Sequence, residues 1–424
     1  MNYTENVIVP ERTLLVSLDT GEYDAEESLR ELWELAKSGG AEPIATMMQK
    51  RPSPETATCV GSGMVEEIRN FCENNEIELI IFDRELTPTQ IRNLENATDV
   101  RVVDRTMLIL DIFAQRAQSR AGKVQVEAAQ LKYLLPRLTG KGTALSRLGG
   151  GIGTRGPGET KLETDRRHIR RRIEALREQL KKIEVGRHET QRRREKDGTV
   201  TVALVGYTNA GKSTLMNLLT QAGVLAEDKL FATLDPTARA LKLPGGKTVM
   251  LIDTVGLVRR LPHHLVEAFR STLEQAATAD IILNVCDASS PEARTHLDVT
   301  NEILQSLGCG DRPVIPVLNK WDLVGDADSA LHLTGAVRIS ALKNEGIPAL
   351  LQAIEDNLPV KPVDVTALLP FAKTDIAAQL RKAGALVSEE YVPEGLLIHA
   401  RVEPREMALI KPYIVENNSE SENV

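Results

Sequence analysis

Apolar positions follow two periods along this chain, and residues 1–105 mix both. Short apolar or β-branched runs alternate there with segments in which apolar residues recur every three or four positions. The expected strands are residues 13–19, 41–48, 78–83 and 100–104. This alternation predicts a small N-terminal domain with a mostly parallel sheet.

From residue 106 the spacing becomes helical. One apolar stripe comprises Val124, Ala128, Leu131, Leu135 and Leu138. A second follows a polar, glycine-rich connection and comprises Leu162, Ile169, Ile173, Leu176, Leu180 and Ile183. Two such stripes predict an antiparallel helical hairpin over residues 106–197. Its second helix is expected over about residues 161–195, with the glycine-rich loop 149–158 at the tip.

Residues 198–360 alternate strand and helix again, which predicts another α/β domain. Residues 361–424 begin with a proline-marked linker, "KPVDVT", from Lys361. The pattern there predicts a small C-terminal domain with a helix, two strands and a disordered end.

The composition is that of a soluble globular protein, with 42% hydrophobic and 26% charged residues. No apolar run reaches the length of a membrane span, and the first residues lack the pattern of a signal peptide. We therefore expect no membrane span and a cytoplasmic location, with any membrane association made through partners. The scattered cysteines favour reduced thiols over disulfides or a metal site; they are Cys59, Cys72, Cys286 and Cys309.

Basic charge is concentrated in one segment. The whole chain carries a formal net charge of −8, yet residues 137–196 hold 18 Lys/Arg against 8 Asp/Glu. The predicted hairpin is therefore a candidate for binding an acidic partner such as nucleic acid.

The strongest motif follows an apolar strand at residues 200–205 and precedes a helix. It satisfies G-x-x-x-x-G-K-[ST], in which backbone N–H groups and the helix dipole bind phosphates. Lys212 can bridge the β- and γ-phosphates, and the Ser213 hydroxyl can ligate Mg²⁺. The candidate phosphate-binding residues are Gly206, Tyr207, Thr208, Asn209, Ala210, Gly211, Lys212 and Ser213.

Two further segments complete the predicted phosphate site. One strand ends in Asp253, Thr254, Val255 and Gly256, which offer a carboxylate to the Mg²⁺ shell and a glycine N–H to the γ-phosphate. Between the motifs lie Phe231, Ala232, Thr233, Leu234 and Asp235. Thr233 is our candidate for the switch threonine that closes over Mg²⁺, with Thr237 as the rival.

The base is predicted to be guanine, so that the ligands are GTP and GDP. An aspartate can accept from the ring N–H and exocyclic amine of guanine, neither of which adenine presents. This aspartate is Asp322 in the run Asn319, Lys320, Trp321 and Asp322, and the loop backbone at Ser340, Ala341 and Leu342 can meet the guanine carbonyl.

Slow intrinsic hydrolysis is expected from Leu257, which follows the Gly256 motif where small GTPases carry a water-orienting glutamine. An apolar side chain cannot orient water by hydrogen bonding. Asn209 could ligate a K⁺ ion near the developing phosphate charge, and the alternative is a loop-stabilising hydrogen bond. The candidate catalytic residues are Lys212, Thr233, Gly256 and Asn209.

A second glycine pair, in "CVGSGMVEEI" (residues 59–68), precedes a predicted helix. These residues could hold a phosphate at the helix N-terminus, or they could form only a tight strand-to-helix turn. The segment has no lysine and no third glycine, which favours the turn.

The motif order resembles the HflX family of translational GTPases. The resemblance covers about residues 10–360 and rests on "VVDRTMLILDIFAQRA", "GGGIGTRGPGETKLETDRR", "GYTNAGKSTL", "FATLDPT", "DTVG" and "NKWD". It implies a GTPase that binds the large ribosomal subunit and its RNA and acts in ribosome splitting, rescue, recycling or assembly. It also implies that the glycine loop reaches the peptidyl transferase region, and some members use ATP through the N-terminal domain.

On this interpretation a loop with few side chains fits a narrow RNA tunnel. The candidate RNA-binding residues are Arg155, Arg166, Arg167, Arg170 and Arg171. The alternative is a disordered connector beside a solvated helix face. The fold class is α/β: a P-loop GTPase domain, preceded by a small parallel α/β domain and a long antiparallel helical hairpin, with a small α+β C-terminal domain.

Three functions remain to be separated. The first is a GTP-driven switch whose hydrolysis the large subunit stimulates. The second is an RNA-binding assembly or hibernation factor in which GTP is only an occupancy signal. The third, a tRNA-modification GTPase, is disfavoured because no cysteine motif or cofactor pattern accompanies the GTPase motifs. We expect a monomer, because the hairpin seam is satisfied within the chain.

Overall fold

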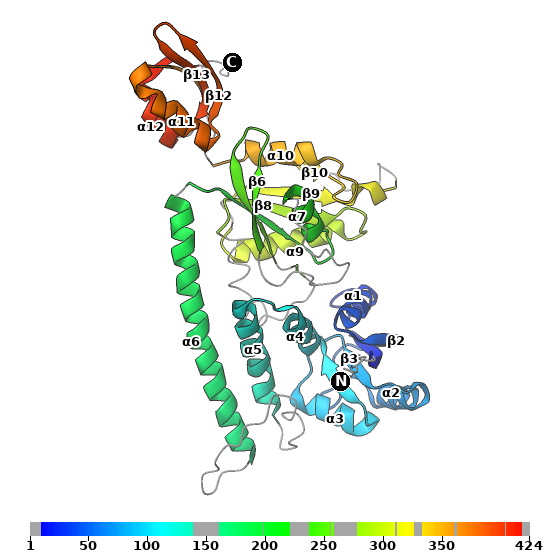
Figure 1. Cartoon of the computed structure of the whole chain (residues 1–424). Helices are drawn as coiled ribbons and strands as arrows, with labels where there is room; N and C mark the ends of the chain where they lie inside the picture. Colours follow the sequence, from blue (N-terminus) through cyan, green and yellow to red (C-terminus); the bar gives the residue numbers. More distant parts are fainter. Residues whose placement is uncertain are drawn as a thin grey trace, which may run out of the picture.

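The computed structural model of this chain describes residues 10–138, 161–196, 198–220, 237–254, 256–257, 278–309, 312–325, 333–359, 363–402 and 404–417. Three sheets follow one another along these residues, and each carries helices (Figure 1). The first and second sheets are joined through a long helix that lies outside both.

The first sheet is parallel, with strand order β2-β1-β3-β4, and confirms the predicted N-terminal α/β unit. Alternate residues of β1 enter different cores: Leu15 joins one apolar cluster, and Leu14 and Val16 join another. Both faces are therefore covered, as the continuous apolar strands require. Its elements are β1 (Arg12–Asp19), α1 (Ala25–Ser38), β2 (Glu42–Lys50), α2 (Ser62–Asn75), β3 (Leu79–Phe82), α3 (Pro88–Thr98) and β4 (Arg101–Asp104).

The helical part is divided more finely than its apolar spacing predicts. α4 (Arg105–Arg116) ends where Ala117 becomes extended, and the Ser119 hydroxyl caps α5 (Arg120–Leu134) by accepting from the Gly122 N–H. A short 3-10 turn (Leu135–Arg137) follows. A serine N-cap thus starts a new helix within a segment whose apolar period continues without a break.

We call α5 and α6 (Lys161–Lys196) together the arm. Arg166 contacts Leu138 and Arg172 contacts Glu127, so the two helices run antiparallel, as predicted. Their seam contains most of the predicted stripe positions: Val124, Ala128, Leu131, Leu138, Ile169, Ile173 and Leu176, with Leu135 and Leu180 packed against them. The 36 residues of α6 give it a length of about 50 Å, and it extends well beyond α5 toward the second sheet (Figure 1).

The second sheet has six strands in the order β10-β9-β8-β5-β7-β6, all parallel except β6. β5 lies at its centre, so the loop that follows β5 opens at the carboxyl edge of the sheet, where α/β folds bind ligands. The elements are β5 (Thr201–Gly206), α7 (Lys212–Thr220), β6 (Thr237–Lys242), β7 (Thr248–Asp253), β8 (Ile281–Asp287), α9 (Ala293–Ser306), β9 (Val314–Asn319), β10 (Val337–Arg338) and α10 (Ile347–Asp356).

The third sheet forms a β-α-β-β-α-β unit with antiparallel strands in the order β12-β13-β11-β14. The sequence pattern predicted the first helix and the two strands that follow it along the chain. It missed the second helix, the last strand and the first strand, whose beginning lies in the predicted linker. The elements are β11 (Val363–Leu369), α11 (Thr374–Ala383), β12 (Leu386–Val392), β13 (Gly395–Val402), α12 (Pro404–Ile410) and β14 (Ile414–Asn417).

Two further expectations concern the described residues as a whole. None of their helices is both long and apolar enough to span a membrane. All four cysteines are free thiols and buried.

Candidate nucleotide site

The loop between β5 and α7 has the close packing that its glycines predict. Gly211 has φ +88°, and a Cβ there would lie 2.2 Å from Asn319 Nδ2. A Cβ on Gly256 would lie 2.6 Å from Thr208 Cγ2. Both glycines are therefore required for the loop, the β7 end and the β9 end to converge at one edge of the sheet.

Lys212 lies in the centre of this convergence. Its Nζ donates to the carbonyl oxygens of Gly206 at 2.9 Å and Tyr207 at 2.7 Å, and the residue is only 7% exposed. Burial lowers the pKa of Lys212 to about 8, although the nearby Asp253 carboxylate opposes the shift. The loop thus fixes the ammonium group where phosphate oxygens would approach the N-terminus of α7.

The metal-binding candidates lie side by side. The Ser213 hydroxyl donates to Asp253 Oδ2 at 3.0 Å, and Asp253 is buried. A hydroxyl and a carboxylate at the phosphate end of the helix are hard oxygen donors, which fit Mg²⁺. The buried hydroxyl of Thr254 donates to the Leu204 carbonyl at 2.6 Å and so ties the end of β7 to β5.

Leu257 does not face the phosphate site. Its side chain is 1% exposed and packs in an apolar cluster with Val205 and Tyr207. Its backbone joins the loop, because the Thr208 N–H donates to the Leu257 carbonyl and the Leu257 N–H donates to the Gly206 carbonyl. The Leu257 side chain therefore cannot orient water at the phosphate.

At the base end, Asn319 connects the two loops that would hold the nucleotide. Its Nδ2 donates to the Ala210 carbonyl at 2.8 Å, and its Oδ1 accepts from the Ala341 N–H at 3.0 Å. Asn319 is buried, so its role is to hold the phosphate loop and the Ser340–Leu342 segment together.

Lys320 has a partner that lies outside the sequence motif. Its Nζ lies 2.7 Å from Asp287 Oδ2, at the carboxyl end of β8. Asp287 also accepts from the backbone N–H and hydroxyl of Ser289, which hold its carboxylate in place. The only sequence signal for Asp287 was an acidic residue at the end of an apolar strand. The Trp321 ring stacks under the Arg338 guanidinium, 4.5 Å from ring centroid to Cζ.

Asp322 is kept ionised, as guanine recognition requires. The Ser340 hydroxyl holds the pKa of Asp322 below its ordinary value, with a smaller contribution from Lys343, whose Nζ lies 3.5 Å from Oδ2. Ser340 and Ala341 are buried, while Leu342 is 84% exposed. The structure therefore brings Asn319, Lys320, Asp322 and Ser340 together at one end of the predicted site.

Several predicted residues lie outside the described residues: Phe231, Ala232, Thr233, Leu234, Asp235, Val255 and Arg155. The rival switch threonine, Thr237, begins β6 and pairs in register with Asp253. Asn209 is exposed with φ +60°, and its side-chain amide makes no hydrogen bond to another described residue. The described part of the chain thus shows no loop-stabilising hydrogen bond from the Asn209 side chain.

The arm arginines divide into two kinds. The Arg166 guanidinium donates to the Leu138 carbonyl, and Arg172 makes a two-bond ion pair with Glu127. These two stabilise the arm itself, and Arg167 is partly buried and also has interactions. Arg170 and Arg171 are exposed and have no ion pair with a described residue.

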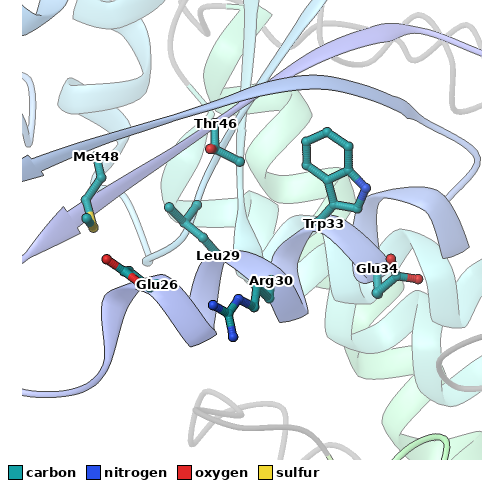
Figure 2. A pocket seen from close by; sticks show the side chains of 7 residues that line it. All are labelled: Glu26, Leu29, Arg30, Trp33, Glu34, Thr46 and Met48. Atoms are coloured by element: carbon teal, nitrogen blue, oxygen red, sulfur yellow. The ribbon is translucent and has the colours of Figure 1, made fainter.

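The weaker phosphate candidate in the N-terminal domain behaves as a turn. The Gly61 N–H, which precedes α2, donates to Gln49 Oε1 at 2.8 Å. A separate cavity of about 480 Å³ lies between α1 and β2, where Leu29 and Trp33 rise toward the strand (Figure 2). Its described lining contains neither lysine nor glycine, so it lacks the groups of a phosphate loop; the lining residues are Glu26, Leu29, Arg30, Trp33, Glu34, Thr46 and Met48.

Comparisons with known proteins identify GTPases along most of the chain. Family models described as GTP-binding GTPase N-terminal, GTP-binding GTPase middle region and 50S ribosome-binding GTPase match residues 26–114, 116–194 and 201–320. A GTPase HflX of Caldanaerobacter subterraneus subsp. tengcongensis is 50% identical, over 92% of this chain and 91% of that protein. The GTPase HflX of Escherichia coli K12 is 39% identical, over 91% and 92%.

A solved GTP-binding protein of Sulfolobus solfataricus in complex with GDP is 25% identical and covers 81% of this chain and 98% of its own, with a TM-score of 0.45. The curated relatives and the family models confirm that this protein binds and hydrolyses GTP. The chain belongs to the HflX family of GTPases.

Proposed function

We propose that this GTPase binds the large ribosomal subunit through its arm, and that the subunit stimulates GTP hydrolysis during ribosome splitting, rescue or recycling. The description of the matching family model, a 50S ribosome-binding GTPase, supports this partner. The distribution of charge on α6 is the structural observation that carries the proposal.

α6 uses one face for the seam with α5 and leaves the other to solvent. Ile169, Ile173 and Leu176 are buried in that seam, whereas Arg170 and Arg171 are exposed. The helix carries 14 Lys/Arg against 7 Asp/Glu. A long rigid rod with unpaired guanidinium groups suits the phosphate backbone of folded RNA, which attracts cations independently of sequence.

Stimulation by a partner also suits the phosphate site. Since Leu257 is buried in the core, the chain supplies no water-orienting group at that position. A group provided by the large subunit, or a loop that the subunit orders, completes the site. Release of the partner then follows hydrolysis, because the switch segments lose their γ-phosphate contacts.

The test is GTP turnover with and without purified large subunits. We expect stimulation of more than about tenfold, which corresponds to about 1.4 kcal/mol of barrier. Two variants should show reduced stimulation at a subsaturating concentration of large subunits. They are Arg170→Ala/Arg171→Ala and a chain lacking residues 149–158. Lys382→Ala/Lys411→Ala removes the same charge from exposed positions of the C-terminal domain and should behave like the parent.

Either of two results would contradict the proposal. Turnover that is independent of subunits, with subunit binding retained, would favour an assembly or hibernation factor in which GTP is an occupancy signal. An equal loss of stimulation in the arm variant and in the C-terminal control would mean that the arm has no specific part in the interaction.

For the metal site, Ser213 and Thr233 are the proposed protein ligands of Mg²⁺, which neutralises phosphate charge when it is bound.

We also propose that the side chain of Asn209 ligates a K⁺ ion in the phosphate site. The exposed amide of Asn209, which no other described residue engages, supports this role. Turnover should be faster in K⁺ than in Na⁺ at equal ionic strength, and Asn209→Ala should remove the difference. Equal parental rates in the two salts would refute the K⁺ site.

A further inference from the structure

One side chain of the phosphate loop contacts the N-terminal domain. The Tyr207 hydroxyl lies 3.3 Å from Glu31 Oε2 of α1 and donates to it. The Tyr207 ring stacks on His296 of α9, with the ring centroids 4.0 Å apart and the planes inclined by 17°. Tyr207 is buried, so its ring is fixed by the GTPase domain while its hydroxyl is held by another domain.

Glu31 is itself held firmly. Its other carboxylate oxygen pairs with Arg105, whose second terminal nitrogen donates to Asp83 Oδ1 at 2.7 Å. Arg105 is 2% exposed and Asp83 is also buried. A buried, ion-paired guanidinium is costly to displace, because moving one partner leaves an uncompensated charge. The Glu31 carboxylate is therefore held in place relative to Arg105, which directly follows β4.

The carboxyl end of β4, which Arg105 directly follows, also anchors the arm. Asp104, next to Arg105, accepts from the Tyr133 hydroxyl of α5 and from the Leu86 N–H. Asp104 and Tyr133 are both buried. The first arm helix and the Glu31 carboxylate are thus fixed to adjacent residues at the carboxyl end of β4.

On the other side of the contact, the Tyr207 backbone belongs to the phosphate site. Its carbonyl accepts from Lys212 Nζ at 2.7 Å, and the residue pairs with Leu257, directly after Gly256. A shift of Tyr207 would therefore displace both an acceptor of the phosphate-binding lysine and the backbone of Leu257, which follows the Asp253–Gly256 segment.

We propose that Tyr207 is a positioning residue through which the N-terminal domain, with the arm attached, holds the phosphate loop in its nucleotide-binding geometry. Loss of the Tyr207–Glu31 hydrogen bond accelerates GDP release. A partner that pulls the arm acts on nucleotide exchange by the same route. The inference concerns two domains of one chain and does not depend on which partner the arm binds.

The test is a double-mutant cycle on the rate of GDP dissociation from the full-length chain, measured by displacement of a fluorescent GDP analogue. Tyr207→Phe keeps the ring and its stacking on His296 but removes the donor. Glu31→Gln weakens the acceptor, and Glu31→Asp keeps the charge that Arg105 requires while shortening its reach. Each single variant should release GDP about fivefold faster, the effect expected for one hydrogen bond.

The double variant distinguishes coupling from general damage. Tyr207→Phe combined with Glu31→Gln should be no faster than either single variant, because both remove the same interaction. Glu27→Gln is the matched control: it lies one turn earlier on α1, pairs with Arg30, and should leave the rate unchanged. Thermal unfolding of every variant shows whether the fold is retained.

Three results would overturn the proposal. The first is unchanged GDP release in Tyr207→Phe. The second is acceleration by Tyr207→Phe with no effect of either Glu31 variant, which would confine the role of Tyr207 to the GTPase domain. The third is fully additive effects in the double variant, which would mean that the two residues act independently.

Discussion

Lys212 carries the charge on which phosphate binding depends, and its surroundings oppose that charge. Burial lowers the pKa of its ammonium group to about 8. Phosphate oxygens favour the protonated form, so the bound complex has a higher pKa than the free protein. Above pH 8 the free protein must therefore take up a proton in order to bind.

The affinity for GDP should consequently fall as the pH rises from 7 to 9, with the steepest change near pH 8. Isothermal titration calorimetry in buffers of different ionisation enthalpy would detect the proton uptake at the upper end of this range. Lys212→Ala should bind far more weakly and without this proton uptake. A constant affinity and no buffer dependence from pH 7 to 9 would show that the lysine stays charged throughout.

At the scale of elements, the sequence was most informative where contacts are local. The seam of the arm follows from apolar intervals of three and four residues, because residues at that spacing lie on one face of a helix. The two apolar faces then pack against each other. The phosphate loop follows from its glycines and Lys212, because the motif occupies one strand, one loop and one helix start.

Other features depend on pairings that no local pattern encodes. Tyr207 and Glu31 are 176 residues apart, and Asp287 approaches Lys320 only because β8 and β9 are adjacent in the sheet. β14 is four residues long and follows a helix, so it lacks a run long enough to show alternation. The break between α4 and α5 required recognition of Ser119 as an N-cap within an unbroken apolar period.

At the scale of the whole molecule, charge and function are separated along the chain. Residues 137–196 carry a net +10 within a chain of net −8, so the remaining residues carry −18. On the proposed function, RNA would attract residues 137–196 and repel the acidic remainder of the chain. Contact with an RNA partner should therefore be concentrated in residues 137–196 and should weaken as salt screens the phosphates.

This separation predicts how binding to the large subunit depends on salt. The logarithm of the association constant should fall linearly with the logarithm of the salt concentration, because cations on the arm release counterions from RNA. Arg170→Ala/Arg171→Ala should reduce the slope by about two units, since each lost phosphate contact removes about one. Lys382→Ala/Lys411→Ala should leave the slope unchanged, because those exposed cations lie on the C-terminal domain. Sedimentation at a series of KCl concentrations measures all three slopes, and equal slopes would mean that α6 does not contact RNA phosphates at these two positions.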